Sequence, residues 1–184
     1  DADLNRAFPG DSDSDIYEER LAAQMMEELK DLKTLDLHET GVSPAPFALF
    51  TDSSPETFNA LQETNVEKAV EISYTQGCGI NNYGGIEVET GPRGTEKSVK
   101  MAYNLLRQFL INNDALEGEK EFSQPKIYSV YGNEERPNSE WNAVVENFVQ
   151  VEKGEIFAEK NGESLQASER FIPVLFAESY PDIF

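Results

Sequence analysis

Apolar residues recur at helical spacing in three segments of the sequence. The first segment runs from residue 16 to about 33, the second from a capped start at Ser54 and Pro55 to about 63, and the third from 95 to about 112. Each pattern predicts an amphipathic helix with one side packed on other elements. The inward positions predicted for the third helix are Val99, Ala102, Leu106, Phe109 and Leu110.

Shorter segments are apolar throughout or alternate between apolar and polar residues, and these predict strands. In residues 35–38, Asp36 and His38 alternate with leucines, so both polar side chains are expected on one face. Residues 47–50 predict a buried strand and residues 86–90 another, while 66–74 fits either a helix or a strand. Further short strands are predicted at 127–131, 147–151, 156–159 and 171–176.

The alternation of strands and helices predicts an α/β fold, a sheet covered by helices. The helical pattern stops near residue 116, where a charged stretch, Leu116-Glu117-Gly118-Glu119-Lys120, suggests a linker. We therefore expect an α/β domain over residues 1–116 and a linker with a small all-β domain over residues 117–184.

Charge is the most unusual bulk property. The 184 residues carry 35 acidic against 15 basic side chains, a formal net charge of −20, spread along the chain. Such a field would repel nucleic acids and anionic membranes, so neither is expected as a partner, and a dispersed acidic coat is typical of halophilic proteins. A single cysteine, Cys78, and the absence of a long apolar run or leader-like start favour a cytoplasmic protein.

The candidate chemistry is sparse. His38 is the one histidine, and a lone histidine at a strand end is more often a hydrogen-bonded structural residue than a metal ligand. A catalytic zinc needs three protein ligands, so His38 cannot hold one unaided. Glu87 and Glu89 share a strand face, and spacing does not decide which would act as a base. Arg6, next to Asn5, offers a rigid fork that suits a carboxylate, although without further context a surface arginine in a turn is the default interpretation.

Three motifs together resemble one known family. They are Asp3-Leu4-Asn5-Arg6 followed by Phe8-Pro9-Gly10, Asp36-Leu37-His38, and Val88-Glu89-Thr90-Gly91-Pro92. They are similar to motifs of the succinylglutamate desuccinylase/aspartoacylase family of zinc-dependent amidohydrolases, and residues 171–180 resemble that family's C-terminal β region. The resemblance implies a carboxypeptidase-like mixed sheet flanked by helices, with a small C-terminal all-β region.

The resemblance also implies a role for each motif residue. His38 would be a zinc ligand, and Asp36 would hold its ring N–H. Glu89 would be the catalytic base and then acid, while Asn5, Arg6 and Tyr180 would bind the substrate. The family's His-x-x-Glu ligand pair precedes the Asp-Leu-Asn-Arg motif, so two further ligands are expected upstream of Asp1.

The expected function is removal of an acyl group from a small N-acyl amino acid by a zinc enzyme, in a monomer or a homo-oligomer. A metal-free relative that binds carboxylates without catalysis is the alternative. Two departures from the aspartoacylase branch argue against N-acetylaspartate as substrate. The loop at residues 77–85 contains no arginine, and Tyr180 lies one residue closer to Glu178 than in that branch.

Overall fold

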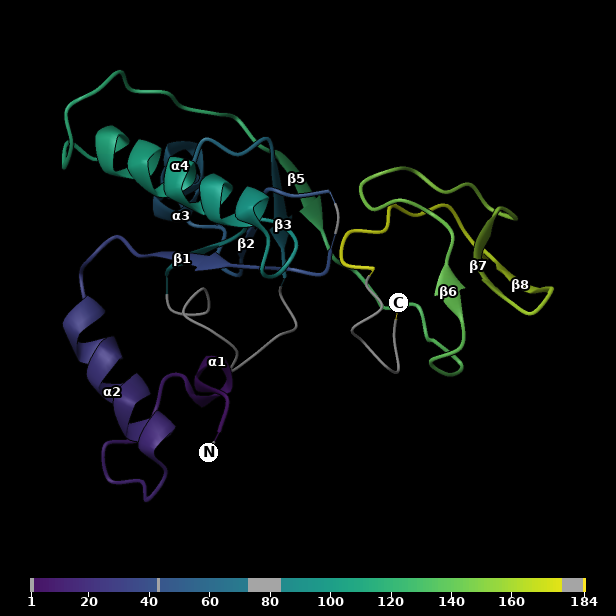
Figure 1. Cartoon of the computed structure of the whole chain (residues 1–184), viewed down its shortest axis with the longest axis horizontal. Helices are drawn as coiled ribbons and strands as arrows, with labels where there is room; N and C mark the ends of the chain where they lie inside the picture. Colours follow the sequence, from purple (N-terminus) through teal and green to yellow (C-terminus); the bar gives the residue numbers. More distant parts are fainter. Residues whose placement is uncertain (1, 43, 73–83, 177–183) are drawn as a thin grey trace.

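The computed structural model describes residues 2–42, 44–72, 84–176 and 184. It contains a five-stranded sheet with helices and a separate three-stranded sheet formed by the C-terminal part of the chain (Figure 1). No helix among the described residues is both long and apolar enough to cross a membrane. The expected α/β class, with a mixed sheet, flanking helices and a small C-terminal β region, is confirmed.

The helices and strands follow the order of the sequence patterns. The helices are α1 (Leu4–Ala7), α2 (Tyr17–Leu29), α3 (Pro55–Glu63) and α4 (Glu96–Asn112). The strands of the large sheet are β1 (Leu35–His38), β2 (Phe47–Phe50), β3 (Lys68–Glu71), β4 (Ile86–Glu89) and β5 (Lys126–Ser129). Those of the small sheet are β6 (Asn142–Ala143), β7 (Ile156–Lys160) and β8 (Glu163–Gln166).

Side-chain caps explain where three of the helices begin. Ser54 accepts a hydrogen bond from the backbone N–H of Thr57 at the start of α3, and Thr95 does the same for Ser98 in α4. At α1 the side chain of Asp3 accepts from the N–H of Asn5. Each cap satisfies a backbone donor that the first helical turn leaves free.

The large sheet has the strand order β1-β4-β2-β3-β5. The strand β4 runs parallel to β1 but antiparallel to β2, while β2, β3 and β5 are parallel to one another. Consequently β1 and β4 end at the same edge of the sheet, and β2 begins there.

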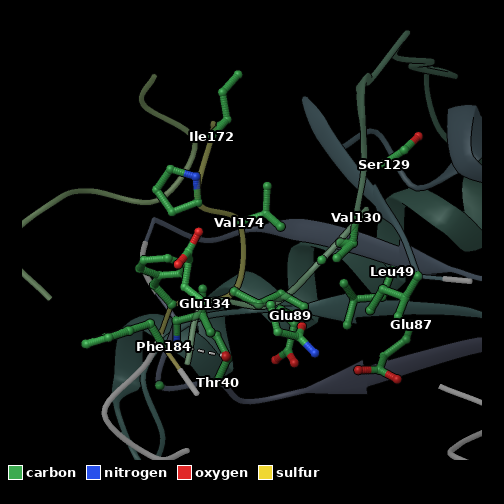
Figure 2. A pocket seen from close by; sticks show the side chains of 18 of the residues that line it. Thr40, Leu49, Glu87, Glu89, Ser129, Val130, Glu134, Ile172, Val174 and Phe184 are labelled. Atoms are coloured by element: carbon green, nitrogen blue, oxygen red, sulfur yellow. Dashed lines mark hydrogen bonds between the residues drawn. The ribbon is translucent and has the colours of Figure 1, made fainter. Parts of the chain in front are cut away.

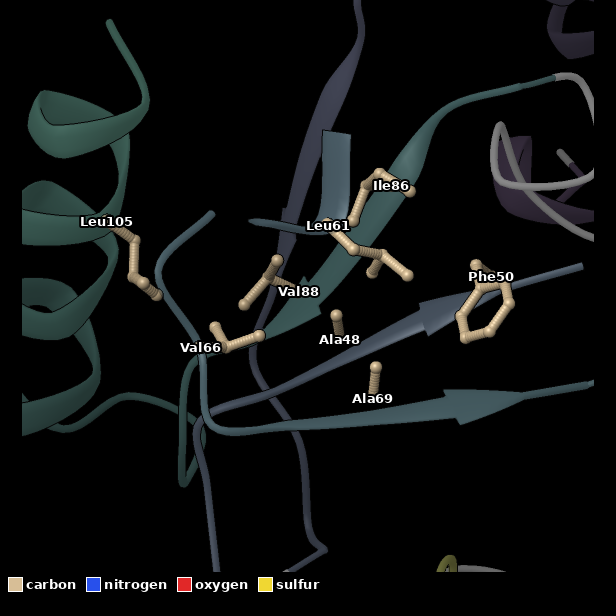
Figure 3. Close-up of a cluster of buried hydrophobic side chains, with 8 residues drawn as sticks. All are labelled: Ala48, Phe50, Leu61, Val66, Ala69, Ile86, Val88 and Leu105. Atoms are coloured by element: carbon tan, nitrogen blue, oxygen red, sulfur yellow. The ribbon is translucent and has the colours of Figure 1, made fainter. Parts of the chain in front are cut away.

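The two faces of the sheet are buried by different parts of the chain. On one face α3 and α4 contribute Leu61 and Leu105 to a cluster with strand residues (Figure 3). On the other face Phe47, Leu49 and Val70 pack against the C-terminal part, including Phe148 and Val174. Because side chains alternate across a strand, this second face also receives the polar residues of β1 and β4.

Several local predictions are corrected by the structure. In α4 the buried apolar positions include Leu105, Phe109 and Ile111, whereas Val99 and Leu106 are exposed. Periodicity could not select the face because this helix carries apolar residues on more than one side. The first predicted helix ends at Leu29 rather than about residue 33.

The strand predictions were right for the large sheet and poorer beyond it. The ambiguous segment 66–74 contains the strand β3. Segments 147–151 and 171–176 form no strand, only an isolated bridge between Val151 and Phe171, and the strands β6 and β8 were not predicted. The domain division at residues 116 and 117 stays a prediction; β5, which follows it, belongs to the large sheet.

Candidate active site

The polar side chains of β1 and β4 form two facing pairs on one face of the sheet. The register places Asp36 beside Glu87 and His38 beside Glu89. Their neighbours Leu35, Leu37, Ile86 and Val88 point to the opposite face, into the core beneath α3 and α4. A period of two along both strands thus gathers one imidazole and three carboxylates on one side.

The ring of His38 lies between two carboxylates. Its Nε2 is 3.1 Å from Oδ2 of Asp36, and its Nδ1 is 3.4 Å from Oε1 of Glu87. The hydrogen bond to Asp36 is the main cause that raises the pKa of His38 to about 9, with the charge of Glu87 adding to it. Without a metal this raised pKa favours the protonated ring, whose two N–H groups face the carboxyl groups of Asp36 and Glu87.

Glu87 and Glu89 are both withdrawn from water, and burial raises the pKa of each. The pKa of Glu89 rises to about 7, with the charge of Glu87 as the second cause. Thr40 hydrogen-bonds to Glu89, yet Oε2 of Glu89 is buried with no hydrogen-bond partner among the described residues. A carboxylate with a pKa near neutrality and one unpaired oxygen is suited to receive a proton.

Asn5 and Arg6 reach the site from a different part of the chain. They lie in α1, which packs against α2 through Phe8 and Ala22. Gly10 makes this packing close, since a Cβ there would lie 2.2 Å from the backbone N of Ala23, and its φ of +85° also favours glycine. The motif's Phe8 and Gly10 thus have a structural role, holding α1 in place.

A single cavity of about 610 Å³ joins these residues. Four residues predicted for the site line it, namely Asn5, Arg6, His38 and Glu89. Asp36 is not among the lining residues but contacts the ring of His38, while Tyr180 lies outside the described residues. Figure 2 shows Glu89 between Glu87 on one side and Glu134 and Phe184 on the other.

The cavity also contains residues that sequence reasoning did not select. The wall above the carboxylates is apolar and comes partly from the C-terminal part of the chain, including Ile172 and Val174. Thr40, which touches Glu89, could have been noticed because it follows His38 by two residues at the strand end. The contribution of Glu134 depends on the path of the C-terminal region, for which the sequence carried no signal.

Comparison with solved structures identifies the fold. No family model and no curated protein matches the sequence. The product-bound ectoine utilization protein EutE (DoeB) from Ruegeria pomeroyi is 19% identical, with a TM-score of 0.70 over 99% of this chain and 66% of that one. A succinylglutamate desuccinylase/aspartoacylase from Rhodobacter sphaeroides is 17% identical, with a TM-score of 0.71 over 98% of this chain and 64% of that one.

Murine aminoacylase 3 is also similar, at 18% identity and a TM-score of 0.67 over 100% of this chain and 77% of that one. The chain thus spans about two thirds of the length of the two bacterial structures. At these identities the likeness concerns the backbone, and it agrees with the mixed sheet and C-terminal β region described above. The protein therefore has the fold of the succinylglutamate desuccinylase/aspartoacylase structures.

Proposed function

We propose that the chain belongs to a zinc-dependent amidohydrolase that removes the acyl group from an N-acyl amino acid. The observation that carries the proposal is the convergence of His38, Glu89, Asn5 and Arg6 on one cavity, from three separate segments of the sequence. The fold supports it, because solved structures with this fold include proteins named as desuccinylases and an aminoacylase.

The donor groups suit a zinc ion. Asp36, His38 and Glu87 each offer a ligand atom, and these atoms lie within 4.8 Å of one another. The site places three carboxyl groups around one imidazole, and the buried Oε2 of Glu89 has no partner among the described residues. A divalent cation would balance the charge of the carboxylates when they ionise. Imidazole nitrogen and carboxylate oxygen are both common zinc ligands.

The geometry suggests which atoms would bind the metal. Asp36 already holds Nε2 of His38, so Nδ1 is the nitrogen left for a cation, and Oε1 of Glu87 lies beside it. A carboxylate on the far nitrogen would also fix the ring's tautomer. A catalytic zinc takes three protein ligands, so with Glu87 counted at least one more would come from outside the described residues.

When bound, zinc would act as a Lewis acid on the amide carbonyl. Glu89 would take a proton from the attacking water and deliver it to the leaving nitrogen, since its pKa near 7 allows both transfers. Arg6 and Asn5 would hold the amino-acid carboxylate, and the guanidinium would grip both of its oxygens. The apolar wall would exclude water from the acyl group.

A second candidate is a metal-free protein that binds carboxylates. It is favoured by the contacts of His38, because Asp36 and Glu87 already satisfy both ring nitrogens without a metal. In that case Arg6 and Asn5 would still bind a carboxylate in the cavity.

Zinc content and hydrolysis distinguish the two. The purified intact protein would be assayed for bound zinc and for amine release from a panel of N-acetyl and N-succinyl amino acids. About one zinc per chain with chelator-sensitive hydrolysis supports the enzyme. No zinc, with binding of the same compounds unchanged by chelator, would support the carboxylate-binding protein.

A further inference from the structure

The start of α4 is connected to the site strands by buried polar contacts. Ser98, which is completely buried, donates a hydrogen bond of 2.6 Å to Oε1 of Glu39. The other oxygen of Glu39 accepts from the backbone N–H of Gly94 at 3.0 Å. Glu39 directly follows His38, so this carboxylate ties the end of β1 to the first turn of α4.

The same contacts continue to the backbone of His38. The buried Thr90 lies 3.3 Å from Ser98, oxygen to oxygen. Its hydroxyl and its backbone N–H both donate to the carbonyl oxygen of His38, each at 2.8 Å. A hydroxyl has one proton, so the bond from Ser98 to Glu39 leaves the proton of Thr90 directed at His38.

These contacts lie just past the last paired residues of β1 and β4, where His38 and Glu89 stand side by side. Beyond that point, among the described residues, the backbone N–H of Thr40 donates to the carbonyl of Gly91 at 2.8 Å, and Nε of Arg93 donates to the carbonyl of Glu39 at 3.4 Å. The spacing between the imidazole and the catalytic carboxylate therefore depends on groups that do not line the cavity, Ser98 and Thr90.

We propose that Ser98 and Glu39 are positioning residues that set the placement of His38 relative to Glu89. The proposal rests on the proposed function, in which His38 binds the metal and Glu89 transfers the proton. Glu39 lines the cavity together with Arg6, whereas Ser98 does not, so removing the Ser98 hydroxyl leaves the lining of the cavity in place. Loss of the Ser98 contact lowers metal affinity and kcat and leaves KM unchanged.

The test compares two buried polar residues of the same helix. Ser98→Ala removes the contact at the start of α4. Asn112→Ala is the matched control at its end, where the buried Asn112 bonds the backbone of Glu63 and Glu121. Both variants lose buried hydrogen bonds and are expected to melt at a lower temperature.

Three readouts are compared, namely zinc affinity by competition with a chromogenic chelator, kcat and KM, and the ring nitrogen shifts of the single histidine in the metal-free chain. A displacement approaching 1 Å in a catalytic group costs up to about a hundredfold, so Ser98→Ala should lower kcat at least about tenfold. It should also weaken zinc binding and shift the His38 signals. Asn112→Ala should change only the melting temperature.

The proposal would be overturned if zinc affinity, kcat and the His38 signals changed equally in the two variants, or if none of them changed in Ser98→Ala. If Ser98→Ala does not fold, Glu39→Ala tests the same network through zinc affinity and the His38 ring shifts, because Glu39 also lines the cavity and its loss changes the cavity wall. A parent protein that neither binds zinc nor hydrolyses N-acyl amino acids would refute the proposed function instead. The His38 ring shifts would then still decide whether Ser98 and Glu39 position that residue.

Discussion

Oδ2 of Asp36 lies 3.1 Å from Nε2 of His38, and only Leu37 separates the two residues on the strand β1. The alternation of the strand puts both side chains on one face, so this contact forms within three consecutive residues. It turns Nδ1 toward Glu87 and the β4 strand. A short local contact thus determines which ring nitrogen meets the neighbouring strand.

The first prediction concerns this contact in the metal-free chain. The sole histidine should titrate near the value of about 9 that the Asp36 bond gives it. Asp36→Asn should lower the pKa of His38, because the largest cause that raises it is removed. Proton NMR of the ring measures this directly, with Asp13→Asn, in a surface loop, as control. An unchanged pKa in Asp36→Asn would show that Asp36 does not hold the ring.

The second prediction separates the roles of Glu87 and Glu89. Glu89→Gln should reduce kcat by about 10²–10⁴-fold, the usual effect of losing a general base, and should leave zinc bound. Glu87→Gln should weaken zinc binding, because an anion beside Nδ1 of His38 is lost. Kinetics and metal analysis on both variants test the assignment. The reverse pattern would exchange the two roles.

The third prediction concerns substrate binding by Arg6. Arg6→Lys should raise KM by about tenfold or more, since a hydrogen bond to a charged group contributes about 1.5–3 kcal/mol and lysine cannot form the paired contact. Arg107→Lys, on an exposed part of α4, should leave KM unchanged. A normal KM in Arg6→Lys would remove this residue from the proposed site.

The fourth prediction is that the metal-free chain loses stability as pH rises from about 5 to 9. Folding raises the pKa of His38 to about 9 and that of Glu89 to about 7, and it raises the pKa of Glu87. The folded chain therefore binds more protons than the unfolded chain in this range, and linkage makes stability fall with pH. Urea unfolding with chelator and molar salt measures the slope, which Glu87→Gln should reduce. A free energy of unfolding that does not change with pH in the parent chain would contradict the raised pKa values.

The fifth prediction follows from the net charge of −20. Repulsion between surface carboxylates is poorly screened when the Debye length grows from about 3 Å at 1 M salt to about 30 Å at 0.01 M. The melting temperature should therefore fall steadily between molar and millimolar potassium chloride. Equal melting temperatures in both would refute the halophile interpretation.

Local features of the fold were predictable from sequence, and contacts between distant segments were not. Ser54 and Thr95 marked the starts of α3 and α4 because a cap acts within one turn. The common face of Asp36 and His38 followed from strand alternation. The contact between His38 and Glu87 was not predicted, because it requires β1 and β4 to pair across about fifty residues of chain.

The same distinction applies to the rest of the site. Motif resemblance assigned roles to Asn5, Arg6, His38 and Glu89, and the structure brings these four to one cavity. Their roles remain proposals. The apolar wall from Ile172 and Val174 depends on how the C-terminal part crosses the sheet, which short apolar segments with no helical period do not reveal.

The insertion of β4 between β1 and β2 has a consequence for the order of folding. The strands β1 and β2 are consecutive in the chain, yet they cannot form a hairpin, because β4 occupies the place between them. Neither β1 nor β2 can pair with β4 until residues 86–89 have reached the sheet. Such non-local pairing is slow to form. We therefore expect the pairing of His38 with Glu89 to form late in folding, after α3 and β3 have been able to associate with β2.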